Sequence, residues 1–391
     1  MQKRDEKFVD YISDSSIMCV SHIASYFEEG NNEDYNRFRR PVFLYNAYDE
    51  YKQDKLDYEE GYKTLGDFEK DLKLKLKGKL EKKENYTHII LFCMGWNNNQ
   101  QESIYRYNKI VTNLKNIAPE KDFKPLVIGL CWPSSWLTIE NSLLKKYLFF
   151  FASYFTKQDD ADEVGMTIAN LIIHNIVLKV KAEIKDEINK EGKNVKLPKI
   201  IAIGHSMGAR ILSRAIFSDG YLVPKYEGDI EVDLFIGLQG AFSANRFVAF
   251  DGWEGSPYAE LCNRETVFSL TTSGNDKANP IAAKITGAKH TGGRHGLRIA
   301  KKRKNSNIFE EVVTWSKTNM QSNLDELDSI KDDREQRNEK KVIMIDVTSI
   351  LEKDKNRYPD PKDAHNDILD AGMAELIWAL IQNFANYSNK K

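Results

Sequence analysis

A chain of 391 residues, 29% of them charged and 11% aromatic, is long enough to bury a full core and has the composition of a globular protein. Its 57 basic residues nearly balance its 58 acidic residues, so the net charge of −1 provides no overall attraction for nucleic acid or acidic lipid. We therefore expect no nucleic-acid partner, and either one large α/β domain with insertions or two domains.

The sequence carries no sign of export or of a structural metal. The charged run Lys3–Lys7 stands where a secretory signal needs apolar residues, and the apolar stretch Tyr147–Phe155 is too short to span a bilayer. No two of the four cysteines form a C-x-x-C pair, and Cys93 and Cys131 lie in apolar strand patterns typical of buried thiols. We expect a cytoplasmic protein without disulfides or a metal site.

Residues 1–85 carry few clear signals, and we interpret them as an N-terminal extension packed on the core. Pro41–Tyr45 has the pattern of a strand, and Leu65–Lys83 has that of a Lys-rich helix. From residue 86 to residue 385, apolar strands alternate with helical patterns, which predicts an α/β domain with a mostly parallel sheet covered by helices on both faces. Its strands are predicted at His88–Gly95, Pro125–Trp132, Ile200–Ile203, Val232–Leu238, Thr266–Thr271 and Val342–Val347, and its helices at Glu102–Asn116, Ala161–Lys190, after residue 206 and at Asp367–Phe384.

Two insertions interrupt this alternation. The first, at about 134–158, is rich in aromatic residues and is predicted to be helical. The second, at about 284–341, begins with eight basic residues and no acidic residue between Lys284 and Lys304. It ends in the mixed-charge run Asp325–Lys341, which is typical of a solvated loop or an exposed helix.

Gly204-His-Ser-Met-Gly208 is a G-x-S-x-G pattern, preceded by the apolar strand Ile200–Ile203 and followed by helix formers. This is the context that a nucleophile elbow requires: a sharp turn holds the hydroxyl of Ser206 clear of the backbone, and the glycines leave room where strand and helix pass closest. The helix N-terminus then favours negative charge that develops on a substrate oxygen. The pattern indicates a serine hydrolase, the alternative being an ordinary glycine-rich turn that carries a surface serine.

A serine nucleophile needs a base, and His365 is the best placed of the seven histidines. It follows the last predicted strand, which brings it to the carboxyl edge of the sheet, where Ser206 must also lie. His205 is adjacent to the serine, but the side chains of successive residues diverge. Four others have ordinary structural explanations, at the start of a strand, within an apolar helix or in the basic insertion: His88, His174, His290 and His295. We predict His365 as the base, the alternative being a histidine of a surface or helix-capping loop.

The carboxylate that orients the base is predicted to be Asp276, in the Gly-Asn-Asp loop directly after the strand Thr266–Thr271. Its alternative role is that of an Asx-turn residue in this loop. Asp233 is a weaker candidate because it lies near the start of its strand, away from the catalytic edge. Three other aspartates are less suited, one inside the last strand and two that flank the histidine too closely but are candidates to cap the final helix: Asp346, Asp363 and Asp367.

Two backbone N–H groups are predicted to bind the oxyanion. One belongs to Met207, directly after the nucleophile, and the other to Trp96, in the loop Met94–Asn99 that follows the first central strand. Gly95 permits the tight turn of this loop. The three asparagines of the loop are candidates to satisfy its carbonyl groups or to cap the helix that follows.

The order Ser206, Asp276, His365, with the G-x-S-x-G pattern and a strand-end Gly-Trp-Asn loop, resembles the α/β-hydrolase superfamily. More narrowly, Gly95-Trp-Asn-Asn98 and Cys131-Trp-Pro-Ser134 are similar to motifs of a group of poorly characterised bacterial hydrolases of esterase or lipase type. The resemblance implies an α/β-hydrolase fold with a central eight-stranded-type sheet. It also implies hydrolysis of a carboxylic ester through an acyl-enzyme.

The resemblance covers about residues 86–285 and 341–385, and it leaves residues 1–60 and the basic insertion unexplained. One position departs from the pattern, because the loop histidine of that group is Met94 here. That histidine braces the oxyanion loop and transfers no proton. Met94 therefore puts the geometry of the loop in question more than the Ser-His-Asp triad.

We expect an esterase- or lipase-like serine hydrolase that acts on a small-molecule or lipid ester and needs no cofactor, since H-E-x-x-H, Walker A and dinucleotide motifs are absent. The aromatic insertion is interpreted either as a cap over an acyl pocket or as core packing. One alternative is a binding or scaffold protein with weak or lost catalysis, which Met94 favours. Another is a phospholipase-like effector that docks at a membrane surface through Lys301–Lys304, although charge runs are usually solvated. The sequence does not determine the oligomeric state.

Overall fold

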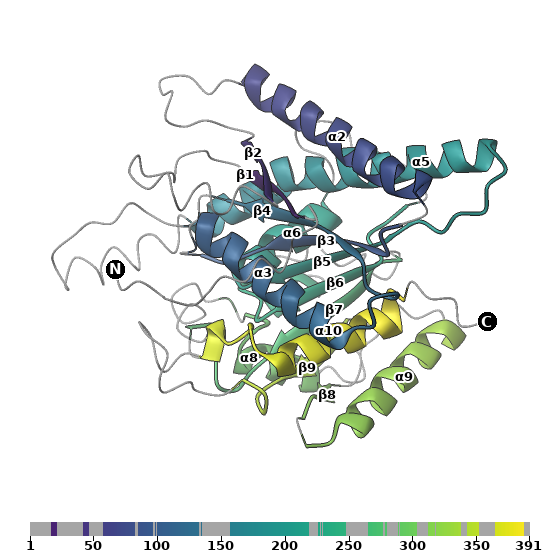
Figure 1. Ribbon diagram of the computed structural model, residues 1–391. Helices are drawn as coiled ribbons and strands as arrows, with labels where there is room; N and C mark the ends of the chain where they lie inside the picture. Colours follow the sequence, from purple (N-terminus) through teal and green to yellow (C-terminus); the bar gives the residue numbers. More distant parts are fainter. Residues whose placement is uncertain are drawn as a thin grey trace, which may run out of the picture.

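A parallel sheet of nine strands lies at the centre of the computed structural model, with helices on both faces (Figure 1). The structure describes residues 17–21, 42–46, 58–82, 85–134 except 97, 99 and 133, 157–218, 226, 228, 230–247, 265–279 except 277, 288, 290–302, 312–337 except 317, 342–351 and 364–386. The strands are β1 (Ile17–Ser21), β2 (Val42–Asn46), β3 (His88–Cys93), β4 (Pro125–Cys131), β5 (Lys199–His205), β6 (Leu234–Leu238), β7 (Val267–Thr272), β8 (Val313–Thr314) and β9 (Ile343–Asp346). They lie in the order β2-β1-β4-β3-β5-β6-β7-β9-β8, and every neighbouring pair is parallel. The expected α/β architecture is confirmed, with one strand more than the eight-stranded type.

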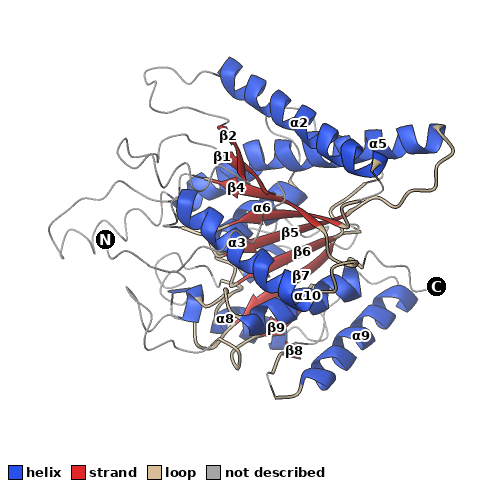
Figure 2. Cartoon of the chain, in the orientation of Figure 1, coloured by secondary structure: helices blue, strands red, loops and turns tan. Residues whose placement is uncertain are grey.

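Two layers of helices cover the sheet (Figure 2). The helices are α2 (Tyr58–Glu81), α3 (Gln100–Ile117), α5 (Lys179–Lys190), α6 (Met207–Phe217), α8 (Arg294–Lys302), α9 (Met320–Arg337) and α10 (Ala371–Phe384). Apolar side chains of α2, α5 and α6 form a core on one face, and those of α3, α9 and α10 form a core on the other. Residues of β3 alternate between the two: Leu91 and Cys93 lie in the first core, and Phe92 lies in the second. Burial on both faces explains why the strands read as continuous apolar runs.

The N-terminal segment contributes strands to the sheet. The strand predicted at Pro41–Tyr45 is observed as β2, and β1 lies between β2 and β4, with Ile17 opposite Val127. The sequence does not predict β1, because a short apolar run is compatible with more than one kind of element. At least these residues of the N-terminal extension therefore belong to the sheet itself.

The long predicted helix Ala161–Lys190 is observed as a continuous helical segment, Lys157–Lys190, that contains two π-helical stretches, η2 (Gly165–Ala169) and η3 (Leu171–Leu178). A Cβ atom at Gly165 would lie 2.9 Å from the carbonyl oxygen of Ile211, so the glycine allows this segment to approach α6 closely. Among the described residues it is the one helix long and apolar enough to cross a membrane, and 72% of its apolar window is buried inside the fold. That burial is the pattern of a core helix.

The structure adds detail to the prediction for the second insertion and corrects the predicted start of the final helix. The mixed-charge run Asp325–Lys341 lies mostly in α9, whose Leu327 is buried in the second core. Helix α10 begins later than predicted, and its N-cap is Asp370, whose carboxylate accepts a hydrogen bond from the backbone N–H of Met373 at 2.9 Å. Asp367 does not cap it, because a 3-10 turn over Ala364–Asn366 (η6) precedes the helix. Asp363, Trp136–Phe155, Arg303 and Lys304 lie outside the described residues.

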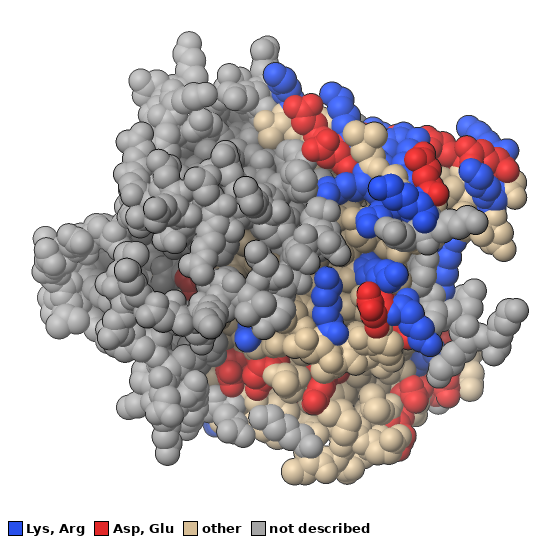
Figure 3. All heavy atoms as spheres, viewed as in Figure 1, with Lys and Arg blue, Asp and Glu red and all other residues tan. Residues whose placement is uncertain are grey.

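Basic and acidic side chains are interspersed over α2 and α5 (Figure 3). Ion pairs cross between the two helices at Lys73–Glu183 (2.5 Å), Lys77–Glu187 (2.5 Å) and Lys179–Glu69 (2.8 Å). Each partner is about one-third exposed, so each pair contributes little to stability. The charges of this surface are paired rather than separated by sign.

The packing of α6 predicts opposite effects for two glycine-to-alanine substitutions. A Cβ atom at Gly208 would lie 2.0 Å from the carbonyl oxygen of Cys93, whereas one at Gly66 in α2 would meet nothing within 4 Å. We expect Gly208→Ala to lower the free energy of unfolding by about 1–3 kcal/mol or more, because backbone must move. Gly66→Ala should raise it by about 0.4–1 kcal/mol, since alanine restricts the unfolded chain. Urea unfolding of both variants measures the difference, and an equal effect of the two would contradict this packing.

Candidate active site

Ser206 occupies a strained turn between β5 and α6. Its backbone has φ 55° and ψ −120°, a conformation that residues with a side chain rarely adopt, and it is one of two non-glycine residues with positive φ among those described. Its backbone N–H donates to the carbonyl of Leu238 (2.9 Å), and its own carbonyl accepts from Ala241 (3.0 Å). The side chain makes no capping hydrogen bond to α6. The strand, turn and helix expected of an elbow are therefore present.

Three glycines leave the space that this turn needs. A Cβ atom at Gly204 would lie 2.4 Å from the Cα of Ala209, and Gly208 lies directly against the backbone of β3. A Cβ atom at Gly95 would lie 2.6 Å from the Cβ of Ser206 and 3.1 Å from its hydroxyl oxygen. The loop that follows β3 consequently lies directly beside the serine.

Asp276 and His365 form a buried pair at the same edge of the sheet. The imidazole Nδ1 of His365, on η6, lies 2.8 Å from Oδ2 of Asp276, which follows β7. Burial by itself would raise the pKa of Asp276. The charge of His365 and its hydrogen bond, together with two hydrogen bonds from Asn279, outweigh burial and hold that pKa below its usual value. The carboxylate is thus ionised and oriented toward the imidazole.

His205 connects this pair to the elbow. Its Nε2 donates a hydrogen bond to the carbonyl oxygen of His365 at 2.9 Å, and the two rings lie 4.8 Å apart between centroids. Burial, followed by the charges of His365 and Arg106, holds the pKa of His205 well below its usual value. A neutral His205, the residue before Ser206, therefore holds the segment that carries His365.

The loop after β3 is held by side chains that the Trp-Pro-Ser segment supplies. The indole N–H of Trp132 donates to the carbonyl of Met94 at 2.8 Å, and the backbone N–H of Asn98 donates to the hydroxyl of Ser134 at 3.1 Å. The amide of Asn98 donates to the carbonyls of Gly95 (2.9 Å) and Trp96 (3.2 Å). Asn98 thus satisfies loop carbonyls, one of its two predicted roles; Asn97 and Asn99 lie outside the described residues.

Residues 69–218 match a family model described as an alpha/beta hydrolase of unknown function (DUF900). The match spans β3 to α6 and so includes the loop at Gly95 and the elbow at Ser206. Together with the parallel sheet and its two helical layers, it decides the fold class. This chain has an α/β-hydrolase fold. No curated protein matches the sequence.

The departure at Met94 does not leave the loop after β3 without support. Met94 is buried in the second core, and its backbone N–H donates to the hydroxyl of Tyr107 at 3.3 Å. The indole of Trp132 holds its carbonyl. Core packing and two backbone hydrogen bonds therefore hold the residue that stands in place of the loop histidine.

The two predicted oxyanion donors lie on elements next to Ser206. Met207 is the first residue of α6, so its N–H is one of those at a helix start that have no partner within the helix. Trp96 follows Gly95 in the loop that lies against the serine.

The rival aspartates lie elsewhere. Asp233 precedes β6 at the amino edge of the sheet, where its carboxylate accepts from the backbone N–H of Ile200 (2.8 Å) and pairs with Lys199 (2.6 Å) and Lys181 (3.6 Å). Asp346 ends β9 and accepts from the backbone N–H of Thr348 at 3.1 Å, which stabilises a turn. Both carboxylates have structural partners away from His365.

The other buried histidines hold helices and strands in place. His88 Nε2 donates to the carbonyl of Ala385, and burial lowers the pKa of His88 to about 4. His174 Nε2 donates to the carbonyl of Ala215. Among the described residues, no group of three His, Cys, Asp or Glu side chains could hold a metal ion.

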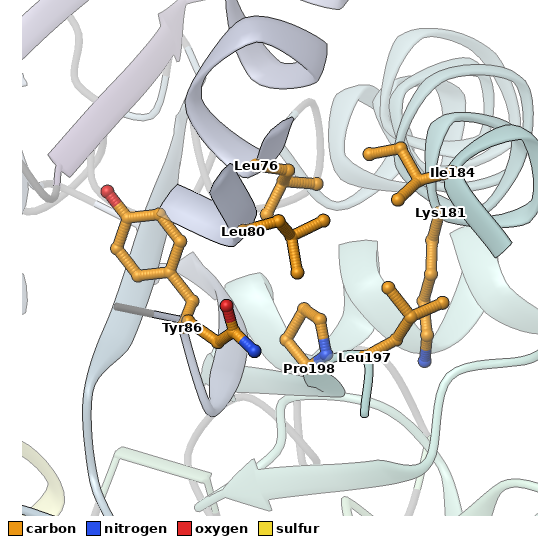
Figure 4. A pocket seen from close by; sticks show the side chains of 8 residues that line it. Leu76, Leu80, Tyr86, Lys181, Ile184, Leu197 and Pro198 are labelled. Atoms are coloured by element: carbon orange, nitrogen blue, oxygen red, sulfur yellow. The ribbon is translucent and has the colours of Figure 1, made fainter. Parts of the chain in front are cut away.

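A small pocket lies between α2 and α5 (Figure 4). Tyr86 and Pro198, which precede β3 and β5, line it together with Leu76 and Leu80 of α2. Because Tyr86 and Pro198 lie at the amino ends of the strands, the pocket is separate from Ser206, which follows the carboxyl end of β5.

Two residues at the site were not identified from the sequence. Asn279 contacts Asp276 with both its backbone and its amide, and His290 contacts Asn279. The sequence assigns His290 only to the basic insertion. The available signal was the glycine pair of His290-Thr-Gly-Gly293 within a charged segment, which indicates tight backbone packing rather than a solvated loop.

The bracing of the loop predicts that Ser134→Ala slows the reaction of Ser206 without unfolding the protein. One oxyanion donor contributes about 10²–10³ in kcat, and a loosened loop misplaces it only in part, so we expect about a tenfold lower rate of inactivation by a fluorophosphonate. The control is Ser349→Ala, which removes a hydroxyl that donates to the carbonyl of Trp315 at the β8 edge. Equal inactivation rates of the two variants would contradict a specific role for Ser134.

Proposed function

We propose that this protein, with its α/β-hydrolase fold, is a serine hydrolase that cleaves carboxylic esters through an acyl-enzyme. Ser206 is the nucleophile, His365 the general base and Asp276 the carboxylate that orients it. The backbone N–H groups of Met207 and Trp96 bind the oxyanion. The substrate is a small-molecule or lipid ester.

In the proposed first half-reaction, Nε2 of His365 accepts the hydroxyl proton as Oγ of Ser206 bonds to the ester carbonyl carbon. The negative charge moves to the carbonyl oxygen, where the two N–H groups stabilise it. The imidazolium then protonates the leaving alcohol as the ester C–O bond breaks. In the second half-reaction a water molecule repeats the sequence, with His365 as base, and releases the acid and the free serine.

The observation that carries this proposal is the strained backbone of Ser206 beside a buried carboxylate–imidazole pair. A φ of 55° with ψ of −120° is unfavourable for a serine, and such strain persists where the surroundings enforce it. The pair at 2.8 Å requires burying an ionised carboxylate, which also costs free energy. The strained turn at Ser206 and the buried Asp276–His365 pair lie at one edge of the sheet and are linked by His205. Catalysis is the simplest explanation for two such costly features in one place.

The competing interpretation is a binding protein that has kept the fold and lost turnover. Met94 was its main support, and the bonds from Trp132 and Tyr107 to the backbone of Met94 weaken that support. The ionised state of Asp276 and its contact with His365 also favour an enzyme.

We predict that Ser206→Ala abolishes both labelling by a fluorophosphonate probe and hydrolysis of short p-nitrophenyl esters while the protein stays folded. The probe reacts only with an activated serine, so it requires no knowledge of the natural substrate. Mass spectrometry of labelled wild-type peptides should locate the adduct on Ser206. An adduct on another residue, or undiminished hydrolysis by the variant, would overturn the nucleophile assignment.

Asp276→Asn should reduce kcat by about 10⁴, the effect of the same change in another triad enzyme, because the amide no longer orients the imidazole. Asp233→Asn is the control, since it alters an ion-paired carboxylate at the amino edge of the sheet, away from His365. It should lower the thermal midpoint but leave kcat within about twofold. A silent Asp276→Asn together with an inactive Asp233→Asn would show that the carboxylate had been misassigned.

A further inference from the structure

His290 lies in a short segment that is hydrogen-bonded on both sides near the carboxyl ends of β6 and β7. Residues 290–293 run between the loop after β6 and the end of β7, with bridges from His290 to Ser243 and from Gly293 to Ser273. The backbone N–H of Thr291 donates to Phe242 (2.8 Å), and that of Gly292 donates to Gly240 (3.0 Å). This part of the basic insertion is therefore a component of the core.

Close packing leaves no space for a side chain at Gly292 or Gly296. A Cβ atom at Gly292 would lie 2.2 Å from the carbonyl carbon of Gln239 and 2.6 Å from the amide nitrogen of Asn279. One at Gly296 would lie 2.2 Å from the carbonyl oxygen of Thr291. His290 itself is 1% exposed, so its ring is held at a defined position next to Asn279.

The hydrogen bonds around Asn279 can be oriented from chemistry alone. Its Nδ2 lies 2.6 Å from Oδ2 of Asp276 and 3.1 Å from the carbonyl oxygen of Gln239. Both neighbours are acceptors, so the two amide protons point to them, and a flipped amide would set oxygen against oxygen. Oδ1 of Asn279 therefore faces Nδ1 of His290 at 3.0 Å, and that nitrogen must carry a proton.

The result is a chain of donors directed at one carboxylate. His290 donates to Asn279, and Asn279 donates to Asp276 through its amide and through its backbone N–H, which lies 3.0 Å from Oδ1. His365 donates to the same carboxylate from the other side. All four side chains are buried, where each bond polarises the next and a misdirected group is costly.

We propose that His290 is a positioning residue of the triad, which fixes the Asn279 amide so that it holds the Asp276 carboxylate in place for His365. This inference rests on the proposed hydrolase function. Neither His290 nor Asn279 reacts with substrate. The proton on Nδ1 of His290 adds a third constraint on the amide, because a flipped amide would set N–H against N–H at His290 and oxygen against the carboxylate of Asp276.

The test compares two replacements of His290 that differ in shape and in hydrogen bonding. His290→Phe keeps the ring volume and removes the donor, whereas His290→Asn loses volume but places an amide N–H near the position of Nδ1. We expect His290→Phe to lower kcat for a p-nitrophenyl ester about 10- to 100-fold with KM unchanged, as for other partners one step removed from a reacting group. His290→Asn should stay within a fewfold of wild type. A purely packing role predicts the reverse order, and that order would overturn the proposal.

A double-mutant cycle tests whether the two residues act through one bond. Asn279→Leu removes the amide at similar volume and should lower kcat at least as much as His290→Phe. The double variant should be no worse than Asn279→Leu alone, because His290 then has no amide left to orient. If the kcat of the double variant fell by the product of the two single losses, the proposed chain of hydrogen bonds from His290 through Asn279 would be contradicted. Asn279→Leu also carries the comparison if His290→Phe does not fold.

A readout independent of turnover separates this inference from the proposed function. Proton NMR of ¹⁵N-histidine-labelled protein should show the Hδ1 proton of His365 far downfield and protected from exchange in wild type and in His290→Asn, and lost from His290→Phe. If this resonance persisted in His290→Phe, the proposed role of His290 would be overturned even if kcat fell. If the wild type hydrolyses no ester but the resonance behaves as expected, the proposed function fails and the positioning role of His290 stands.

Discussion

Among the described glycines, Gly208 makes the closest approach to another backbone, where α6 meets the end of β3. Because Gly208 has no side chain, the first turn of α6 lies directly on the carbonyl groups of Cys93 and Met94. The same approach forces the turn at Ser206 and sets the loop of Gly95 against the serine. A displacement of this helix by the width of one methyl group would move Ser206, the start of α6 and the loop of Gly95 together. The geometry of the site therefore depends on van der Waals contact before it depends on any polar interaction.

Buried ion pairs also hold the segments that follow Ser206 in place. Arg210 of α6 and Arg246 of η4 (Ala244–Phe247) share the carboxylate of Asp162, which keeps its pKa below the usual value despite burial. This cluster ties the long helix to the residues that follow Ser206. Buried charges of this kind seldom add much stability, but removing one partner is costly because the other is left buried and unpaired. Asp162 thus connects α6 and η4 to the long helix.

The departure at Met94 shows how a loop can keep its geometry with different partners. In this chain the loop carbonyls are bound by the indole of Trp132 and the amide of Asn98. Ser134 accepts from the backbone N–H of Asn98 and donates to its carbonyl. The two short motifs that carried the resemblance are consequently one structural unit, although 36 residues separate Asn98 from Ser134.

The elbow and the alternation of strands and helices can be predicted from the sequence, because they depend on local patterns: apolar runs, turn glycines and a serine between them. Asp276 and His365 could be nominated by their positions after strands, but only the folded chain brings them together across 89 residues. The role of residues 290–293 could not be predicted, since it depends on two strand ends that enclose the segment from either side. The cap of α10 differs for a similar reason, as the turn that holds His365 delays the helix until Asp370. Local composition determined which residues were able to act, and long-range packing decided which of them lie within hydrogen-bond distance of one another.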